Sequence, residues 1–523
     1  MPSATIETAE VPVLSRLLRG TFWLALKTPV SAVLALWSIP LTQRYINYEQ
    51  NGDYLFAWDF GFIQLVLEFG MGSVLQKQMT DAWARDDRAA VDRTIACGMN
   101  FYAAIGLIQM VLLLGIAYGG LPARLRDSSL VVGLLWVQIL STPFYGLSAV
   151  TGSVLQAARR YEFIPRLELA IIVLRFVLLG IGYATGAPFL LVVAGQVAIQ
   201  IGLSLGPALY VMTRELGHWP HFGGARRSDY AALMHISLFM ALLQWSVVLA
   251  DKLDVIVLGY ALTDKDSGFW ITVYQNVSKP FFQIRQASWT LAYLVMPVVV
   301  SLSVAGDRVG LERIKYDGTR YVIALLAPVT LLAGIYAAPF LGLWVGPTFV
   351  PHAWMLQLFL VATLPLGLQV IGQMALGMGY LKIPALASIA GALINLPLSY
   401  FLTRRVGVSG VIWGTVLTTL VSNLLIPGAY FFRALEIRPA TFLARTLAAP
   451  IAGVLALVPA CYAFRLVLPP DPVGAGALGR LGPFLVNLAV GCLAYLGGYL
   501  LAPTGRDDLR SLARTVSRRR EPS

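Results

Sequence analysis

Ionisable side chains inside long apolar stretches are the residues of this sequence that are best suited to chemistry. A charged side chain at the centre of a bilayer costs about 2.5 to 3.5 kcal/mol on the insertion scale, so nine facing lipid would cost roughly 25 kcal/mol. We therefore expect these residues to face one another, or water, inside a cavity. The nine are Asp59, Glu68, Glu168, Arg175, Asp251, Lys252, Asp254, Lys279 and Arg285.

The basic members of this set suit an anionic ligand. Arg175 and Arg285 each carry a planar guanidinium, which offers a phosphate two parallel donors where an ammonium offers only a point charge. Lys279 adds positive charge in the same stretch as Arg285. Glu168 precedes Arg175 by two helical turns and shares its helix face. We expect Arg175, Arg285 and Lys279, together with Glu68, to line a substrate site, and Glu168 to line the cavity.

The acidic members have two interpretations. Asp251 and Asp254 share a helix face, whereas Lys252 points about 100° away from Asp251. Together with Asp59 they are candidates for cavity lining or for a cation or proton site. The alternative is that Asp251, Lys252 and Asp254 are solvated charges near a helix end.

Apolar stretches that are long enough to cross a bilayer fill residues 21–502. A hydrocarbon core about 30 Å thick needs about 20 residues per helix. The chain is 57% hydrophobic and only 13% charged, far from the balance of about 25% charged that is usual for soluble proteins. These features predict an all-α polytopic membrane protein with fourteen transmembrane helices. The expected spans are 21–43, 53–76, 96–118, 130–155, 163–184, 188–213, 232–260, 268–298, 320–345, 355–378, 382–402, 408–432, 443–465 and 481–502.

The net charge of +12 is sorted by membrane side rather than gathered into a nucleic-acid-binding face. Lys and Arg concentrate before the first span and in every second loop after it. By the positive-inside rule, both termini are cytoplasmic, which requires an even number of spans. The first span is too long for a cleaved signal peptide and is expected to be an uncleaved anchor.

The chain also contains an internal repeat. The motif Asp-Arg-x-x-Val-Asp-Arg at 87–93 returns as Asp-Arg-x-x-Leu-Glu-Arg at 307–313, an offset of 220. Ile-Pro at 164–165 returns at 383–384, and Gly52 is echoed by Gly268. Near-constant offsets indicate six helices followed by six more in the same order.

The repeat predicts two six-helix lobes around a central cleft, with two helices appended. Parallel repeats related by an axis along the membrane normal are a design in which a central site opens to either side by rocking. A bundle enlarged by duplication alone is the alternative. The expected parts are an N-lobe 1–213, a cytoplasmic connector 214–231, a C-lobe 232–434, the appended helices 435–502 and a basic cytoplasmic tail 503–523.

No cofactor or metal site is expected. Cys97, Cys461 and Cys492 lie within predicted helices and far apart in sequence, which argues against a disulfide framework or a metal cluster. His218 and His221 form an HxxH pair, but no third ligand accompanies them. No Walker motif appears either, so transport is not driven by a fused ATPase.

Three segments of the chain resemble polysaccharide flippases. The small-residue stretch 407–423, the passage 377–398 and the passage 254–268 are similar to corresponding segments of that family. The superfamily comprises multidrug, oligosaccharidyl-lipid and polysaccharide exporters, and the resemblance is to its lipid-linked oligosaccharide (O-antigen type) branch. It implies a non-enzymatic flippase in a bacterial inner membrane, with possible roles in lipopolysaccharide O-antigen or exopolysaccharide biosynthesis.

The resemblance implies that a polyprenyl-diphosphate-linked glycan moves from the cytoplasmic to the outer leaflet by alternating access, coupled to H⁺ or Na⁺. Arg285 and Arg175 would hold its phosphates. Glu68 and Arg285 are 217 positions apart, within the range of the repeat offsets. We therefore expect them to pair across the empty cleft and to separate when the substrate arrives or when Glu68 is protonated.

Other function classes remain open at this point. A cell-wall lipid precursor flippase, and a multidrug or sodium-coupled exporter of the same superfamily, would share the helix layout. Four basic residues inside the spans favour an anionic lipid over a cationic drug. A non-transporting scaffold that recruits polymerase or ligase enzymes for polysaccharide synthesis would also fit, but it would tolerate loss of Arg175 and Arg285.

Overall fold

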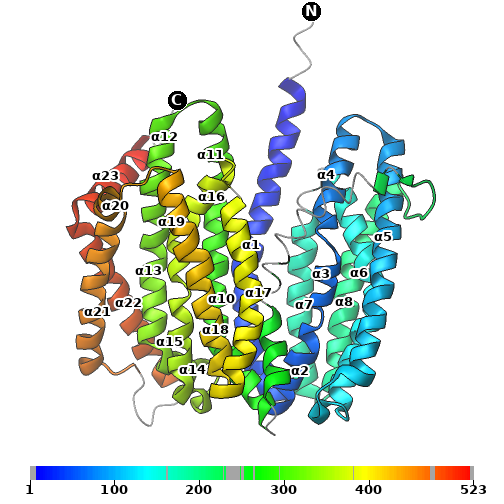
Figure 1. Ribbon diagram of the computed structural model, residues 1–523, viewed down its shortest axis with the longest axis horizontal. Helices are drawn as coiled ribbons and strands as arrows, with labels where there is room; N and C mark the ends of the chain where they lie inside the picture. Colours follow the sequence, from blue (N-terminus) through cyan, green and yellow to red (C-terminus); the bar gives the residue numbers. More distant parts are fainter. Residues whose placement is uncertain are drawn as a thin grey trace, which may run out of the picture. The chain divides into compact units, whose positions relative to one another are not determined.

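The computed structural model describes residues 7–158, 160, 163–227, 229, 230, 245, 248, 252–262, 266–293, 295–380, 382–470 and 477–518 of the 523-residue chain. Every regular element within these ranges is a helix (Figure 1). The all-α prediction is therefore confirmed for the part of the chain that the structure describes.

Ten helices in the described ranges are long and apolar enough to cross a membrane, and one bent pair makes an eleventh. Helix α1 (Glu7–Tyr45) and helix α10 (Ser267–Tyr293), with 39 and 27 residues, also exceed the length that a span needs. Most of the expected span 232–260 lies outside the described residues. The chain is a multi-pass membrane protein, while the count of fourteen helices and the lobe arrangement stay predictions.

Packing divides the chain into two compact units, Met1–Thr272 and Val273–Ser523. The domain limits expected from the sequence stay predictions. The remaining labelled helices of the first unit are α2 (Tyr48–Asp59), α3 (Phe62–Leu67), α4 (Met71–Ala84), α5 (Arg88–Gly115), α6 (Ser129–Ala157), α7 (Phe163–Thr185) and α8 (Phe189–Tyr210), and residues 252–261 are also helical.

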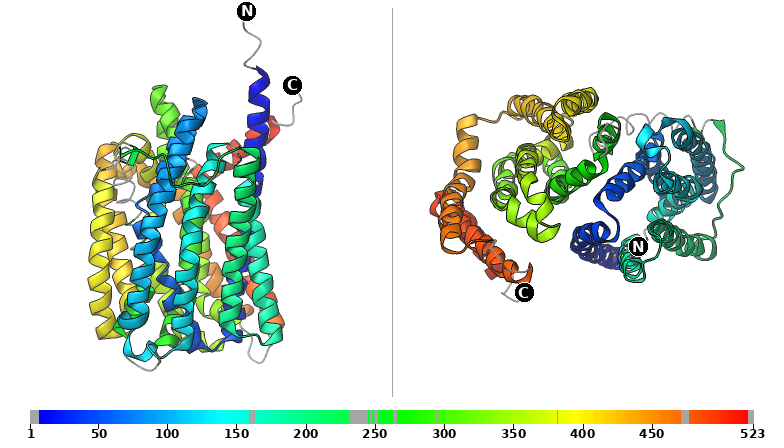
Figure 2. Two further views of the ribbon diagram at one scale, coloured as in Figure 1. Left: turned by 90° about the vertical axis from the view of Figure 1, so that its right-hand side faces the viewer. Right: turned by 90° about the horizontal axis from the view of Figure 1, so that it is seen from below.

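The second unit contains most of α10 and all later helices. Helices α21 and α22 lie side by side in it (Figure 2). The helices after α10 are α11 (Val295–Val304), α12 (Arg308–Arg313), α13 (Thr319–Ile335), α14 (Ala337–Trp344), α15 (Ala353–Val361), α16 (Gln369–Gly377), α17 (Lys382–Val406), α18 (Ser409–Thr419), α19 (Ile426–Ala434), α20 (Pro439–Phe442), α21 (Ala448–Val467), α22 (Ala477–Leu501) and α23 (Pro503–Arg518).

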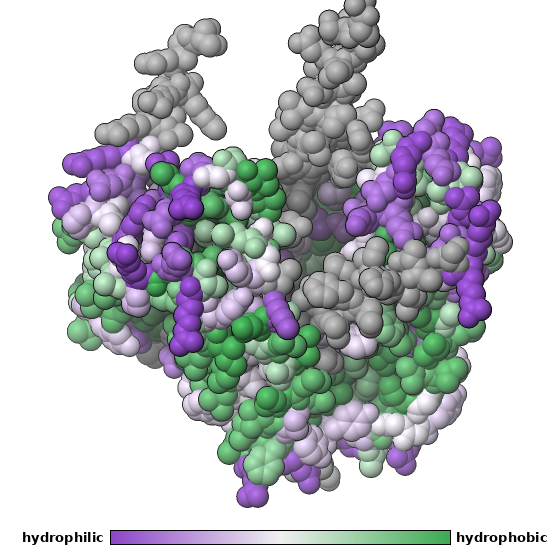
Figure 3. Space-filling view, turned by 45° about the horizontal axis from the view of Figure 1, so that its top comes forward, coloured by the Kyte–Doolittle hydropathy of each residue, from purple (hydrophilic) through white to green (hydrophobic). Residues whose placement is uncertain are grey.

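Hydrophilic and apolar side chains are segregated along the helix axes. In each unit, hydrophilic residues gather at the end where α4 or α12 lies, and apolar residues cover the helices below that end (Figure 3). Large apolar side chains are exposed on these helices, such as Val111 (67%) on α5 and Leu455 (69%) on α21. This is the pattern of a surface that is covered by lipid.

The repeated Asp-Arg motif has the same local structure in both units. Asp87 and Asp307 are the N-caps of α5 and α12, and each carboxylate accepts the backbone N–H three residues later at 2.9 Å. The residue before each aspartate has a positive φ, 54° at Asp86 and 68° at Gly306. An aspartate at this position satisfies an otherwise unpaired helix N–H, so the motif fixes the start of a helix in both copies.

A buried ion pair attaches the C-terminal helix α23 to the second unit. Arg320 of α13 is only 4% exposed, and its Nε donates to Asp508 Oδ2 at 2.9 Å while its Nη2 contacts Oδ1. The Tyr499 hydroxyl donates to the same carboxylate at 2.5 Å. Arg320 and Asp508 are 188 positions apart, so this pair joins the appended helices to α13.

The network extends through Asp317 to the beginning of α21. Asp317 accepts from Arg320 at 3.1 Å and from Arg445 at 3.0 and 3.1 Å. Arg445 lies in the π-helical turn Leu443–Leu447 that precedes α21. Two arginines and two aspartates therefore balance one another where α13, α21, α22 and α23 meet.

We predict that Asp508→Asn destabilises the protein by about 3–5 kcal/mol, because it leaves the buried Arg320 charge without compensation. Asp507→Asn is the matched control, since Asp507 is 70% exposed and pairs only with the exposed Arg510 at 3.4 Å, an interaction worth about 0–1 kcal/mol. Thermal unfolding of the purified protein in detergent, followed by tryptophan fluorescence, measures both. Equal melting temperatures for the two variants would contradict the structural role of the buried pair.

Candidate functional site in a broken transmembrane helix

The stretch expected as one continuous span at 53–76 is broken twice. Helix α2 ends at Asp59, α3 ends at Leu67, and α4 begins only at Met71. The axis bends by 44° between α3 and α4, where Phe69 and Gly70 both have positive φ, 52° and 68°. The predicted span therefore contains a bend that the apolar pattern did not indicate, because the backbone turns through the left-handed region there, which glycine adopts without strain.

Both predicted carboxylates of this span lie at the breaks. Asp59 is the last residue of α2, and Glu68 is the C-cap of α3. A negative charge is unfavourable at a helix C-terminus, where the helix dipole is also negative. The positions therefore cost free energy unless neighbouring groups compensate, and carboxylates placed in this way are candidates for function.

Side chains from other helices satisfy the backbone groups that the breaks release. The Gln138 side chain donates Nε2–H to the Ala57 carbonyl at 2.7 Å, and Trp245 donates its indole N–H to the Val66 carbonyl at 2.7 Å. The Trp245 ring also packs edge-on against Phe69, with the ring centroids 5.1 Å apart. Irregular backbone at membrane depth is tolerated only where protein groups or water satisfy it, so these contacts hold the broken conformation.

The two carboxylates have different partners. The Tyr102 hydroxyl donates to Glu68 Oε1 at 2.6 Å. Asp59 lies 3.6 Å from the Lys252 ammonium, whose side chain is 45% exposed. Glu68 is therefore held by a neutral donor and Asp59 by a looser ion pair. The structure places both at the same broken span.

The charged residues of α7 contact two different neighbours. Glu168 pairs with Lys27 of α1 at 2.5 Å. Arg175 donates Nη1–H to Gln200 of α8 at 2.9 Å, and its own backbone carbonyl accepts from Gln196 at 3.0 Å. The long helix α1 thus supplies a partner to the site that the sequence did not indicate, because Lys27 lies near the end of its span.

In the second unit, Arg285 lies among aromatic rings. Its guanidinium carbon is 4.9 Å from the Phe282 ring centroid, 5.2 Å from Trp289 and 5.6 Å from Phe281. Lys279 lies on the same helix, immediately before Pro280. Cation–π contacts of this kind stabilise a cation where water is scarce. Arg285 is therefore a positive charge that the aromatic rings of its own helix, α10, stabilise.

The remaining predicted residues are Asp251 and Asp254. Asp251 lies outside the described residues, and Asp254 is 2% exposed. Within the described ranges no group of three His, Cys, Asp or Glu side chains has the arrangement of a metal site. The roles assigned to the nine charges stay predictions, as does the pairing of Glu68 with Arg285.

The two repeat-related glycines meet within the first unit. A Cβ atom built on Gly52 would overlap the backbone of Gly268, and one on Gly268 would meet the backbone and carboxylate of Glu49. Beside this contact, the Asn51 amide donates to the Thr272 hydroxyl at 2.9 Å, and that hydroxyl donates to the Tyr48 carbonyl at 2.7 Å. The starts of α2 and α10 are thus in tight contact. The charge bias predicts that these helix ends lie on the outer side of the membrane.

Comparison with known proteins now identifies the family. Residues 17–284, a little over half of the chain, match the polysaccharide biosynthesis protein family. The chain belongs to this family. It is 24% identical over 481 residues to the uncharacterized membrane protein EpsK of Bacillus subtilis (strain 168), covering 84% of this chain and 88% of EpsK.

Two solved structures have the same fold. The lipid II flippase MurJ in an inward closed conformation superposes with a TM-score of 0.67 at 14% identity, covering 91% of this chain and 98% of MurJ. An inward-facing multidrug resistance transporter of the MATE family, in the MOP superfamily, gives a TM-score of 0.60 at 13% identity, covering 78% and 96%. These likenesses agree with the family resemblance found in the sequence.

We predict that Gly52→Ala separates the starts of α2 and α10, because overpacking against backbone costs about 1–3 kcal/mol, which shifts the equilibrium between packed and separated helix starts by about fivefold or more. The separation is measured by double electron–electron resonance between spin labels at the exposed positions Gln50 and Asp266. The native cysteines are replaced first. The control is Gly202→Ala, where a Cβ atom meets open space. An unchanged distance distribution in Gly52→Ala would rule out a tight contact that keeps these ends closed.

Proposed function

We propose that this protein is a flippase that moves a polyprenyl-diphosphate-linked oligosaccharide from the cytoplasmic to the outer leaflet by alternating access. Its family is one of polysaccharide biosynthesis, and its fold is that of transport proteins. The observation that carries the proposal is Arg285, a guanidinium among three aromatic rings within a membrane helix. A guanidinium suits a diphosphate and aromatic rings suit sugar faces, so one site serves both parts of the head group.

The residues then have distinct roles. Arg285 and Arg175 bind the phosphates, and Lys279 adds positive charge on α10. Gln200 accepts from the Arg175 guanidinium, which positions it before the substrate arrives, and Gln196 donates to the backbone carbonyl of Arg175. The polyprenyl chain stays in lipid throughout. No covalent bond forms or breaks, so the protein acts as a transporter without a cofactor and not as an enzyme.

The switch in transport is an exchange of charge partners, and the proton or ion gradient sets its direction. Glu68 pairs with Arg285 when the site is empty, and the substrate diphosphate takes its place. The Tyr102 hydroxyl stabilises the Glu68 carboxylate in the structure. Protonation of Glu68, or binding of Na⁺ near Asp59, Asp251 and Asp254, would release Arg285 for the next substrate.

Alternating access requires that a closed end can open. The contact of Gly52 with Gly268 and the hydrogen bond of Asn51 to Thr272 hold the predicted outer end closed. The breaks after Asp59 and Leu67 place bends within the same span, where a helix can change direction without disrupting a regular hydrogen-bonded segment. Release of the glycan to the outer side therefore requires these contacts to separate.

A cell-wall lipid precursor flippase is the second candidate, because the MurJ structure covers 91% of this chain. Lipid II and lipid-linked oligosaccharides share a polyprenyl diphosphate, so the same residues would bind either one. For both candidates we infer a bacterial inner membrane with both termini in the cytoplasm. Polymerase or ligase enzymes that consume the glycan would be partners on the outer face.

We predict that Arg285→Ala reduces flipping at least tenfold, because a hydrogen bond to a charged group contributes about 1.5–3 kcal/mol. Arg285→Lys keeps the charge but loses the planar donors, so it should retain intermediate activity. The measurement is mass spectrometry of lipid-linked glycans in cells treated with an external glycan-reactive probe. Arg433→Ala, at an exposed predicted cytoplasmic position, is the control.

The two candidate functions are distinguished by the identity of the lipid-linked glycan that accumulates where the external probe cannot reach it. Accumulation of a lipid-linked oligosaccharide supports the first candidate, and accumulation of a cell-wall precursor supports the second. Normal lipid-linked glycans in Arg285→Ala and in an Arg175→Ala, Arg285→Ala double variant would refute both and favour a scaffold.

The charge-exchange step has its own test. We predict that Glu68→Arg and Arg285→Glu each abolish flipping, whereas the double variant recovers a measurable part of it, because reversal of both charges restores their attraction. The same glycan assay reads the result, and membrane levels of each variant are matched by immunoblot. Loss in both single variants without any recovery in the double would exclude the pairing of these two residues.

A further inference from the structure

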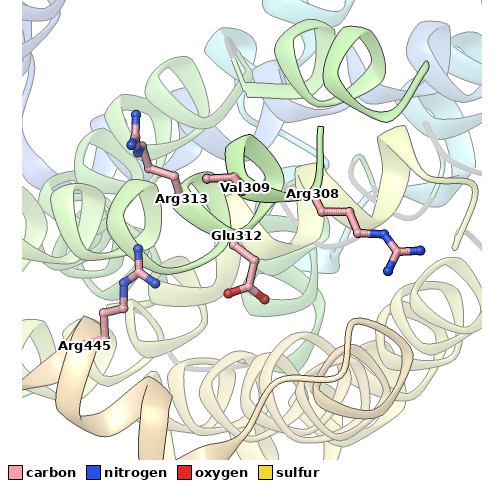
Figure 4. Close-up of a pocket in the computed structure, with 5 residues that line it drawn as sticks. All are labelled: Arg308, Val309, Glu312, Arg313 and Arg445. Atoms are coloured by element: carbon pink, nitrogen blue, oxygen red, sulfur yellow. The ribbon is translucent and has the colours of Figure 1, made fainter. Parts of the chain in front are cut away.

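A basic crevice of about 290 Å³ lies on the second unit and uses none of the residues proposed for transport. Four of its lining residues, Arg308, Val309, Glu312 and Arg313, come from α12, and Arg445 comes from the turn before α21 (Figure 4). Its volume is close to the lower end of the range for small-molecule pockets, about 300 Å³. The crevice is therefore large enough for a compact polar group.

The crevice lining has an excess of positive charge. The lining contains three guanidiniums and one carboxylate, Glu312, which lies 3.3 Å from the ammonium of Lys315. Asp317 already balances Arg445, so the excess comes from Arg308 and Arg313. Lys315 is 7% exposed and also donates to the Leu435 carbonyl at 2.9 Å. The buried ammonium of Lys315 therefore neutralises part of the negative charge of Glu312. The lining is thus suited to an anion.

Arg445 is positioned before any ligand binds. Asp317 accepts from its Nε at 3.1 Å and from its Nη2 at 3.0 Å, and the guanidinium lies 5.2 Å from the centroid of the Tyr316 ring. In Figure 4 the side chains of Arg308 and Arg313 leave α12 in different directions, with Glu312 between Arg308 and Arg445. The positive charges are spread along the crevice, which suits an extended head group better than a small ion.

The position of the crevice indicates a lipid. Helix α12 begins the candidate span Arg308–Ile335, and Arg445 lies near the start of the candidate span Pro439–Val467. Two apolar side chains are exposed beside the guanidiniums, Val309 at 71% and Leu443 at 55%. Basic residues next to exposed apolar residues at the end of a span are typical of the head-group region. The charge bias predicts this end to be cytoplasmic, where the leaflet carries anionic lipids.

We propose that this crevice binds the phosphate of an anionic phospholipid of the cytoplasmic leaflet. The guanidiniums of Arg308, Arg313 and Arg445 contact the head group, while the acyl chains lie against Val309 and Leu443. Free phosphate shares the charge but has no chains to bury. The proposal is independent of the transported substrate.

The first unit provides a matched control. The motif that forms α12 is repeated at Arg88 and Arg93, but Asp92 stands in the place of Glu312 and pairs with His218 Nδ1 at 2.6 Å. Arg445 belongs to a segment that follows the two repeats. Removal of Arg88 and Arg93 therefore takes away the same charges from an equivalent element without altering the crevice.

The test is native mass spectrometry of the full-length protein in detergent, titrated with phosphatidylglycerol and, separately, with phosphatidylcholine. The double variant Arg308→Gln, Arg313→Gln should bind phosphatidylglycerol about 25-fold more weakly, since each basic residue near an anionic surface contributes about fivefold. Glu312→Gln should bind it severalfold more tightly. The double variant Arg88→Gln, Arg93→Gln should bind like the wild type.

Three results would overturn the proposal. Equal binding of phosphatidylcholine, or equal loss in the Arg88 and Arg93 control, would show that the crevice has no role in recognition. Displacement of phosphatidylglycerol by millimolar inorganic phosphate would assign the site to a soluble anion. Because Glu312→Gln is expected to gain affinity, an unfolded arginine variant cannot imitate the full pattern.

Discussion

The cost of a charge or an unpaired backbone group in hydrocarbon is the constraint on which the rest of this structure depends. The first unit meets it by supplying partners from other helices, as Tyr102 does for Glu68 and Lys27 for Glu168. The second unit stabilises Arg285 with aromatic rings. Stacking uses the flat faces of a guanidinium, whereas its donors lie at the edge. The rings therefore leave the edge of the Arg285 guanidinium for hydrogen bonding, whereas the contacts of Glu68 and Glu168 join helices to one another.

The broken helix follows from the same constraint. A span can leave helical geometry only where the released carbonyls find donors, and Gln138 and Trp245 supply them at the breaks next to Asp59 and Glu68. The same segment begins at the locked contact of Gly52 with Gly268. The glycine contact, both breaks and both carboxylates therefore lie on one continuous stretch of chain, from Gly52 to Met71.

The sequence allowed prediction of the membrane class, the helical content and the family, because apolar length and small-residue motifs are local features. It also indicated Glu68 and Asp59, since a charge in an apolar run is conspicuous. The helix breaks beside them were not predicted, although Gly70 and Gly72 offered a signal, because glycine is common within membrane helices. The pair of Arg320 with Asp508 was beyond prediction, because 188 positions separate them. Arg320 begins an expected span and Asp508 belongs to the expected basic tail, and solvation is the usual expectation in both places.

The two copies of the repeated motif begin their helices in the same way but use their charged side chains differently. Asp87 and Asp307 cap their helices in the same way, since that role depends only on local backbone geometry. Four residues past each helix start the two copies differ in use: Asp92 pairs with His218, whereas Glu312 lines a basic crevice. Arg445 also lines the crevice and comes from the turn before α21, which follows the two repeated motifs. Asp317 holds the Arg445 guanidinium in place. The turn before α21 therefore adds a guanidinium to this crevice that the motif in α12 does not supply.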